Sequence, residues 1–157
     1  MTDSTGTTTR TERRPFLRAI GATAVAGTAA LAGCAGADGG SGDGEYDGWM
    51  ESAVGYDGET ADRTGEDEVT VEVGAGDGYS FSPAAVRVTD GTTVVWEWTG
   101  RGSRHNVVDE GGSYESPYYR AEGETFEHAF EEVGTSKYAC DPHRNMGMKG
   151  VVDVVEG

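Results

Sequence analysis

Four side chains that bind soft metal ions gather near the end of the sequence. Cys140, His143 and two methionines, Met146 and Met148, lie within nine residues of one another. Sulfur ligands combined with imidazole select copper over calcium, magnesium or manganese. A trigonal site needs a second imidazole, which His105 can supply from a separate strand. The pattern therefore predicts a site for one copper ion, Cu(I)/Cu(II).

The ligand types also indicate what such a copper ion would do. Two His nitrogens and one Cys thiolate in a trigonal arrangement, with a long axial Met sulfur, form the geometry of blue-copper electron transfer. This geometry is a compromise between the preferences of the two copper charge states, so little rearranges when one electron arrives or leaves. The predicted chemistry is one-electron transfer and not catalysis. Spacing alone leaves the axial position open between Met146 and Met148.

Two further residues near these ligands have predicted roles. Pro142 has no backbone N–H and removes one possible donor to the thiolate. We expect fewer hydrogen bonds on that sulfur to raise the reduction potential. The remaining histidine, His128, shares a predicted strand face with Phe126 and Phe130, and we interpret it as structural.

The ligands must be held by strands, because residues 46–157 consist of short runs with period two bounded by Gly, Pro, Asp and Ser. About seven such runs predict an all-β fold, an antiparallel Greek-key β-sandwich. For residues 47–54 the pattern does not decide between a helical turn and an edge piece. The predicted strands are Val69–Val73, Val86–Val88, Val94–Trp98, His105–Val108, Glu124–Phe130, Ser136–Cys140 and Gly150–Val155.

The first 45 residues are interpreted as targeting and tether segments. Arg13 and Arg14 precede an apolar stretch at 19–32, which is shorter than the roughly 20 residues needed to cross a bilayer. The paired arginines indicate twin-arginine export. The sequence Leu-Ala-Gly-Cys ending at Cys34 resembles a lipobox. We therefore predict a signal peptide at 1–33, then a lipidated Cys34 and a disordered Gly/Asp tether at 34–45.

The net charge excludes one class of partner. Against 28 Asp and Glu there are 12 Lys and Arg, giving a formal charge of -16. Nucleic-acid binding rests on clustered basic residues, so no nucleic-acid partner is expected. The acids are spread along the chain, which favours a solvated surface adapted to high salt over a docking patch for a basic partner.

The spacing Cys-x-x-His-x4-Met, with His-Asn about 35 residues upstream, resembles that of the cupredoxins. Within them the chain is most similar to the halocyanins, the membrane-anchored blue-copper proteins of halophilic archaea, with plastocyanin and pseudoazurin as wider relatives. The resemblance covers about residues 46–157 and the exported, lipid-anchored layout. It implies a cupredoxin-like sandwich and a monomeric one-electron carrier on the extracytoplasmic face of the cell membrane.

The resemblance also assigns individual residues. In these proteins the axial ligand is followed closely by Gly and then by alternating valines, as Met148 is, so Met148 is preferred over Met146. Asn106 resembles the asparagine that ties the upstream ligand loop to the cysteine loop. Electrons are expected to leave through the exposed edge of His143, towards redox partners that include membrane respiratory complexes.

Other functions account for the residues less well. A copper enzyme needs a further copper bound by extra histidines, and the chain has only three His. Copper delivery or storage, the main alternative, favours Met-rich exposed sites, which the scattered methionines do not provide. A catalytic cysteine at Cys140 would leave the upstream His and the Met unexplained.

Overall fold

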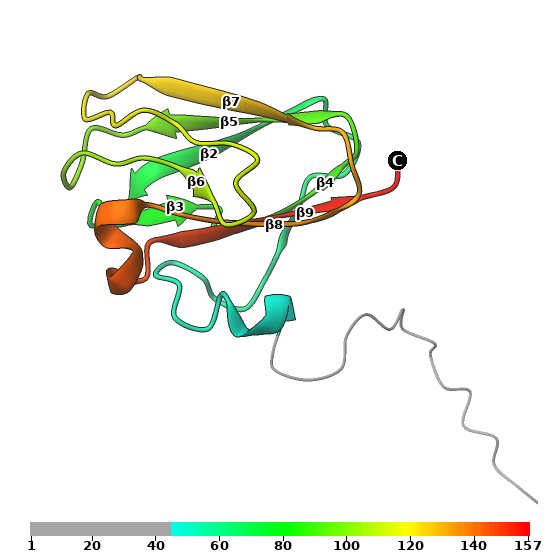
Figure 1. The fold of residues 1–157 in the computed structure, drawn as a ribbon, viewed down its shortest axis with the longest axis horizontal. Coiled ribbons are helices and arrows are strands. Elements are labelled where there is room, and N and C mark those ends of the chain that lie inside the picture. The colour runs from blue at the N-terminus through cyan, green and yellow to red at the C-terminus, as the bar shows by residue number, and fades with distance from the viewer. Residues whose placement is uncertain (1–44) are drawn as a thin grey trace, which may run out of the picture. The chain divides into compact units, whose positions relative to one another are not determined.

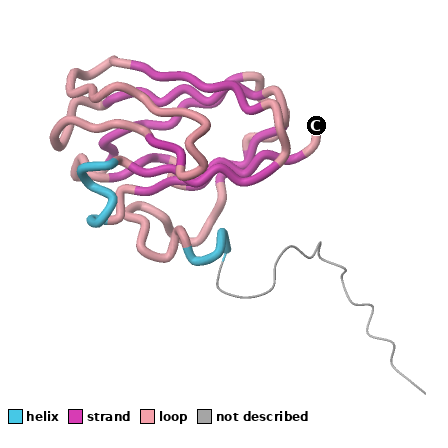
Figure 2. Tube along the Cα trace, viewed as in Figure 1, coloured by secondary structure: helices cyan, strands magenta, loops and turns pink. Residues whose placement is uncertain are grey.

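Two β-sheets pack face to face in residues 45–157, the part of the chain that the computed structural model describes (Figure 1). Figure 2 shows that strands and loops dominate and that helix is confined to two short pieces. The first sheet has the order β1 (Ala61–Asp62), β4 (Ala85–Thr89), β9 (Lys149–Val155), β8 (Gly134–Ala139) and β6 (Val108–Asp109). The second has the order β3 (Ser80–Ser82), β2 (Glu68–Ala75), β5 (Thr92–Trp98) and β7 (Thr125–Phe130).

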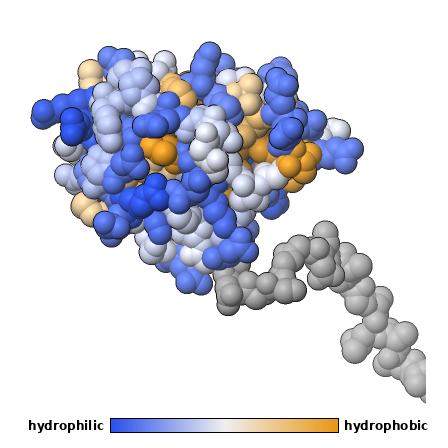
Figure 3. All heavy atoms as spheres, viewed as in Figure 1, coloured by the Kyte–Doolittle hydropathy of each residue, from blue (hydrophilic) through white to orange (hydrophobic). Residues whose placement is uncertain are grey.

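Alternating side chains build the core between the sheets. Along β5, Val94, Trp96 and Trp98 are buried, and Glu97 between the two tryptophans is exposed. Successive strand residues point to opposite faces, so each valine alternation places one face inside. The outer surface is correspondingly polar, and hydrophilic residues cover most of the face drawn in Figure 3. The result is a rigid frame whose loops can hold ligands.

The predicted β-sandwich is confirmed, with one difference in strand pairing. The sheets are mixed, because β1 pairs with β4, β4 with β9 and β2 with β5 in parallel, and the other four pairings are antiparallel. Alternation shows which face of a strand is buried but not which strand lies beside it. The sequence also missed β1 and β3, which are too short to show a period.

Two short helical pieces and the irregular segments lie outside the strands. The first, η1 (Glu45–Gly48), is a single turn, and η2 (Asp141–Met146) is a 3-10 helix between β8 and β9. The predicted strand at 105–108 is mostly irregular, and His105 makes an isolated bridge with Tyr119. No helix among the described residues is long and apolar enough to span a membrane. The predictions for Arg13, Arg14 and Cys34 lie outside the described residues.

Candidate metal centre

The connection from β8 to β9 and the loop between β5 and β6 bring the predicted ligands together. Cys140 follows β8 directly, His143 lies in η2, and Met148 immediately precedes β9. His105 comes from the loop between β5 and β6. In Figure 1, η2 lies at one end of the sandwich and the C-terminus at the other. The site is therefore built on loops that the sheets hold in place at one end.

Three donor atoms form a small triangle. The Nδ1 atoms of His105 and His143 are 3.1 Å apart, and Cys140 Sγ lies 3.7 Å from Nδ1 of His105 and 3.4 Å from Nδ1 of His143. Donors held about 2.0 to 2.3 Å from a first-row metal ion in a trigonal arrangement are about 3.5 Å apart. The triangle thus fits one ion at its centre. Among the described residues, His105, Cys140 and His143 form the cluster of potential metal ligands in which the donor atoms are close enough to hold one ion.

The hydrogen bond of His105 leaves its Nδ1 free for a metal. Its Nε2–H donates to the backbone carbonyl of Arg101 at 3.0 Å. The Ser103 N–H approaches the same nitrogen at 3.4 Å, but the shorter contact is with the carbonyl oxygen, which can only accept. We therefore assign the proton to Nε2 and the lone pair to Nδ1. That lone pair belongs to the atom facing Cys140 Sγ. A hydrogen bond on the far ring nitrogen is the usual way in which proteins orient a metal-binding imidazole.

Burial favours the neutral form of each of the three groups before metal binds. It lowers the pKa of both His105 and His143, because a charged imidazolium is poorly solvated inside the protein. Burial also raises the pKa of the Cys140 thiol, an effect that backbone N–H groups of Asn106 and His143 partly offset. Neutral imidazoles are ready to bind metal, whereas the thiol must lose its proton on binding.

The two methionines differ sharply in their surroundings. Met148 is fully buried, whereas Met146 is 55% exposed. The backbone N–H of Met148 donates to the His143 carbonyl at 3.2 Å, and its carbonyl accepts from the Cys140 N–H at 3.0 Å. Met148 is therefore the thioether that the fold fixes next to two ligands, and together with His105, Cys140 and His143 it fits one copper ion.

Asn106 links the loop that carries His105 to the ligand loop, residues 140–148, which carries the other three ligands. It is fully buried and exchanges two hydrogen bonds with Asp141, one through the Asp141 backbone N–H and one through the carboxylate. Pro142 is exposed on the ligand loop, in the first turn of η2. Arg144 on the same helix pairs with Glu110 and Asp141, which ties the exposed side of the loop to the body of the protein.

Sequence reasoning missed several residues around His105. The indole N–H of Trp98 donates to the His105 carbonyl at 3.2 Å. Tyr79 packs edge-on against His143 and His105, with ring centroids 5.0 Å and 6.2 Å apart. Trp98 lies in a strand whose alternation explains its burial, and Tyr79 lies in a turn rich in Gly and Asp. Neither position carries a sequence signal for contact with a ligand.

His128 lies away from this centre. It is half-buried on β7, where its ring lies 4.5 Å from that of Tyr114 and 5.0 Å from that of Phe130. It is absent from the metal-binding group found in the described part of the chain. Its contacts are those of a packing residue.

A β-sandwich that holds a buried His-Cys-His triangle on the loops at one end defines the cupredoxin class of copper proteins. Residues 67–155 match the family described as copper binding proteins, plastocyanin/azurin family. The chain belongs to that family, and the prediction of a cupredoxin made from the ligand spacing is confirmed.

Comparison with individual proteins shows which members of this family the chain resembles. The chain is 46% identical to halocyanin from Natronomonas pharaonis, over 90% of this chain and 96% of halocyanin. It is 38% identical to plastocyanin from Scenedesmus fuscus, over 55% of this chain and 99% of plastocyanin. Among solved structures, a mutant fern plastocyanin matches with a TM-score of 0.49 and 24% identity, covering 55% of this chain and all of that one. The similarity to halocyanin and the family match make the chain a halocyanin-like blue copper protein.

Proposed function

We propose that this protein carries single electrons between redox partners at the outer face of the cell membrane, to which a lipid on Cys34 anchors it. Electron transfer in general follows from the blue-copper family and from the site. The observation that carries the proposal is the triangle of two imidazole nitrogens and one cysteine sulfur, with edges of 3.1 to 3.7 Å. When bound, copper supplies a charge that changes by one unit with little movement of its ligands.

The side chains of this protein keep that movement small. Asn106 and the Met148 backbone bonds hold the two ligand loops at a fixed separation. The Arg101 carbonyl fixes the ring of His105. His105 is 1% exposed and His143 is 9% exposed, so His143 is the ligand through which electrons pass to a partner. A partner that docks over η2 reaches the site by the shortest path.

The proposed location rests on the N-terminal sequence. Arg13 and Arg14 with the apolar stretch at 19–32 favour export, and the motif ending at Cys34 favours lipidation. The similarity to halocyanin extends over 90% of the chain and therefore into this region. A Gly-rich tether of about ten residues lets a monomeric domain reach membrane respiratory complexes beside its anchor.

Spectroscopy of the copper-loaded protein tests the electron-carrier function. We expect an intense visible thiolate-to-copper band, a narrow hyperfine splitting in the paramagnetic resonance spectrum and a reversible one-electron reduction. Cys140→Ser should abolish the visible band, and His128→Ala should leave it unchanged. A colourless oxidised holoprotein, or irreversible reduction with rapid copper transfer to an acceptor, would contradict electron transfer and favour copper delivery.

Cell fractionation tests the location separately. The wild-type protein should be recovered in the membrane fraction of the native host and should be accessible to protease added outside the cell. Cys34→Ala should move it to the soluble extracytoplasmic fraction, and replacing Arg13 and Arg14 by Lys should retain it inside. Equal membrane recovery of wild type and Cys34→Ala would contradict the lipid anchor.

A further inference from the structure

Residues Trp49–Val54, here called the strap, lie outside the family match, which begins at residue 67. In Figure 1 they form part of the cyan segment beneath the sheet that contains β8 and β9. On β9, Val152 and Val154 point into the main core, so Val151 points to the outer face. There Met50 of the strap is 1% exposed and packs with Val151 and two alanines. The strap is thus anchored on the outside of the sheet.

The strap also bonds to the chain on both sides of Met148. The Val54 N–H donates to the Gly147 carbonyl at 2.8 Å, just before this methionine. The Trp49 indole N–H donates to the Gly150 carbonyl at 3.1 Å, just after it. Three elements therefore meet at the end of the ligand loop: η2, β9 and the strap.

Lys149 adds a third link. Its Nζ donates to Ser52 Oγ at 3.0 Å and lies 4.6 Å from the centroid of the Trp49 ring. A cation over an indole face is attracted by the ring's quadrupole. Three links thus join residues 147, 149 and 150 to the strap. Met148 lies between the first and second of these residues.

The approach of the two segments is close enough to require glycine. Gly147 has a φ of +90°, and a Cβ there would collide with the Ser52 carbonyl and press on Val54. The side chains of Pro142 and Met146 are exposed, so they add little packing to this part of the loop. Contacts with the strap therefore act together with the Asn106–Asp141 and Arg144–Glu110 contacts to keep the end of the loop in place.

We propose that the strap is a positioning element of the copper site, which holds residues 147–150 so that Met148 keeps a fixed place relative to Cys140 and His143. This inference rests on the proposed function. By restricting the loop end, the strap slows the opening through which the ion is lost. It acts on the ion only through Met148 and the backbone, and it touches no donor atom of the triangle.

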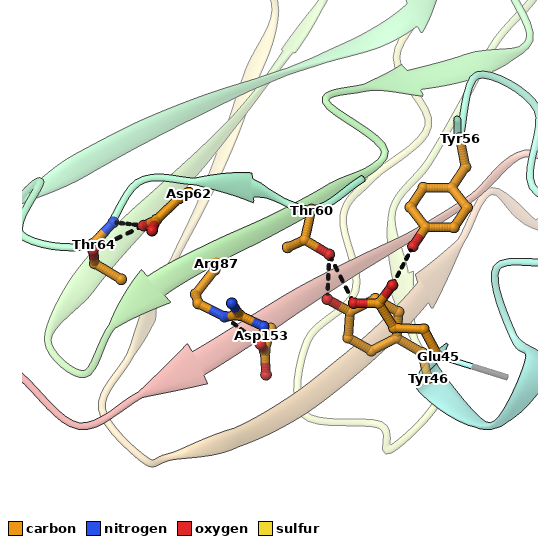
Figure 4. Close-up of polar contacts among 8 residues, drawn as sticks. All are labelled: Glu45, Tyr46, Tyr56, Thr60, Asp62, Thr64, Arg87 and Asp153. Atoms are coloured by element: carbon orange, nitrogen blue, oxygen red, sulfur yellow. Dashed lines mark hydrogen bonds and ion pairs between the residues drawn. The ribbon is translucent and has the colours of Figure 1, made fainter. Parts of the chain in front are cut away.

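The test uses two strap variants, meaning variants that break a link between the strap and residues 149–150. Their double variant and one matched control are added, all in the full-length protein. Trp49→Phe keeps an aromatic ring but removes the donor to Gly150, and Lys149→Met removes the bond to Ser52 and the charge over the ring. Tyr56→Phe removes a hydrogen bond to Glu45 within the same N-terminal segment (Figure 4). It leaves the three links to residues 147, 149 and 150 intact. All four variants are loaded with copper and compared with wild type.

The first readout is the rate at which reduced protein gives up copper to an excess of bicinchoninate, a chelator of Cu(I). We expect the double strap variant to lose copper about tenfold faster than wild type. This is the lower end of the effect seen when residues that support metal ligands are substituted. Tyr56→Phe should match wild type. Equal release from all proteins, or faster release only in proportion to a loss of global stability measured with urea, would overturn the proposal.

The second readout is amide hydrogen exchange of the reduced, copper-loaded protein, which also shows whether the variants are folded. Exchange at Met148 and Lys149 should accelerate in the strap variants, and exchange in β2 should not change. Uniform acceleration would mean that the strap only stabilises the fold, and the proposal would fail. A wild-type protein without reversible one-electron reduction would instead refute the electron-carrier function, whatever the release rates.

Discussion

Asn106 and Asp141 face each other across the two loops that carry the ligands. The Asp141 N–H donates to Asn106 Oδ1 at 2.9 Å, and Asn106 Nδ2 donates to Asp141 Oδ2 at 3.2 Å. Asn106 follows His105 and Asp141 follows Cys140, so this pair sets the 3.7 Å separation between the imidazole and the thiol. Hydrogen bonds of the protein frame therefore help to set this separation.

Removing the amide of Asn106 should weaken both the fold and the site. Asn106→Ala leaves the Asp141 N–H without its partner, so we expect the free energy of unfolding to fall by about 2 kcal/mol. Urea unfolding of the metal-free protein measures this loss, and the visible band should also weaken. Asn145→Ala, at an exposed position on the same loop, should change neither quantity. An unchanged unfolding free energy for Asn106→Ala would show that the pair does not hold the loops.

The choice between the two methionines can be tested by the reduction potential. Met148→Gln replaces a soft thioether by a harder oxygen donor, which favours the more highly charged oxidised ion, so we expect the potential to fall. Met146→Gln alters an exposed side chain and should leave the potential unchanged. Voltammetry of both variants measures the difference. A shift at Met146 and none at Met148 would assign the axial position to Met146.

The sequence predicts the buried strand faces, through their periodicity, and the copper site, through the chemistry of its ligands. The alternation of Val94, Trp96 and Trp98 predicts a buried strand face, and the soft donors around Cys140 predict copper. It does not predict that β2 lies parallel to β5, because neighbours in a sheet are set by packing across the whole fold. Nor does it predict the contact of Tyr79 with two imidazoles, since that contact arises where separate loops meet.

The ionisation of Tyr56 gives a prediction at high pH. Burial and the bond to Glu45 raise the pKa of Tyr56 to about 12 (Figure 4). The neutral phenol is thus favoured in the folded state, and its stabilising effect is complete below the ordinary tyrosine value near 10. It is lost as the pH rises from about 10 to about 12. The unfolding free energy of wild type should fall across this interval by more than that of Tyr56→Phe.

An ultraviolet titration of the same two proteins provides the direct measurement. The difference between them should show one phenolate forming near pH 12. A difference curve centred near pH 10 would contradict the prediction, because it would place the Tyr56 side chain in free contact with solvent.

Substitutions at two glycines that share the same φ distinguish the cost of backbone strain from disturbance of the site. Gly102 and Gly112 both have a φ of +77°, in the region that side chains disfavour. Alanine at Gly112 would meet no atom within 4 Å, so Gly112→Ala should lose only about 1 to 2 kcal/mol of unfolding free energy. Its copper spectrum should remain that of wild type.

Gly102→Ala should do more. A Cβ there would collide with the Gly78 carbonyl and lie 3.0 Å from Nε2 of His105, the atom that donates to Arg101. Forcing these loops apart costs a further 1 to 3 kcal/mol or so, as overpacking does, and turns the His105 ring away from Cys140. We expect a weakened visible band and a changed hyperfine splitting in addition to the larger loss of stability. Equal losses in the two variants, with an unaltered spectrum in both, would show that the loop at Gly102 does not position His105.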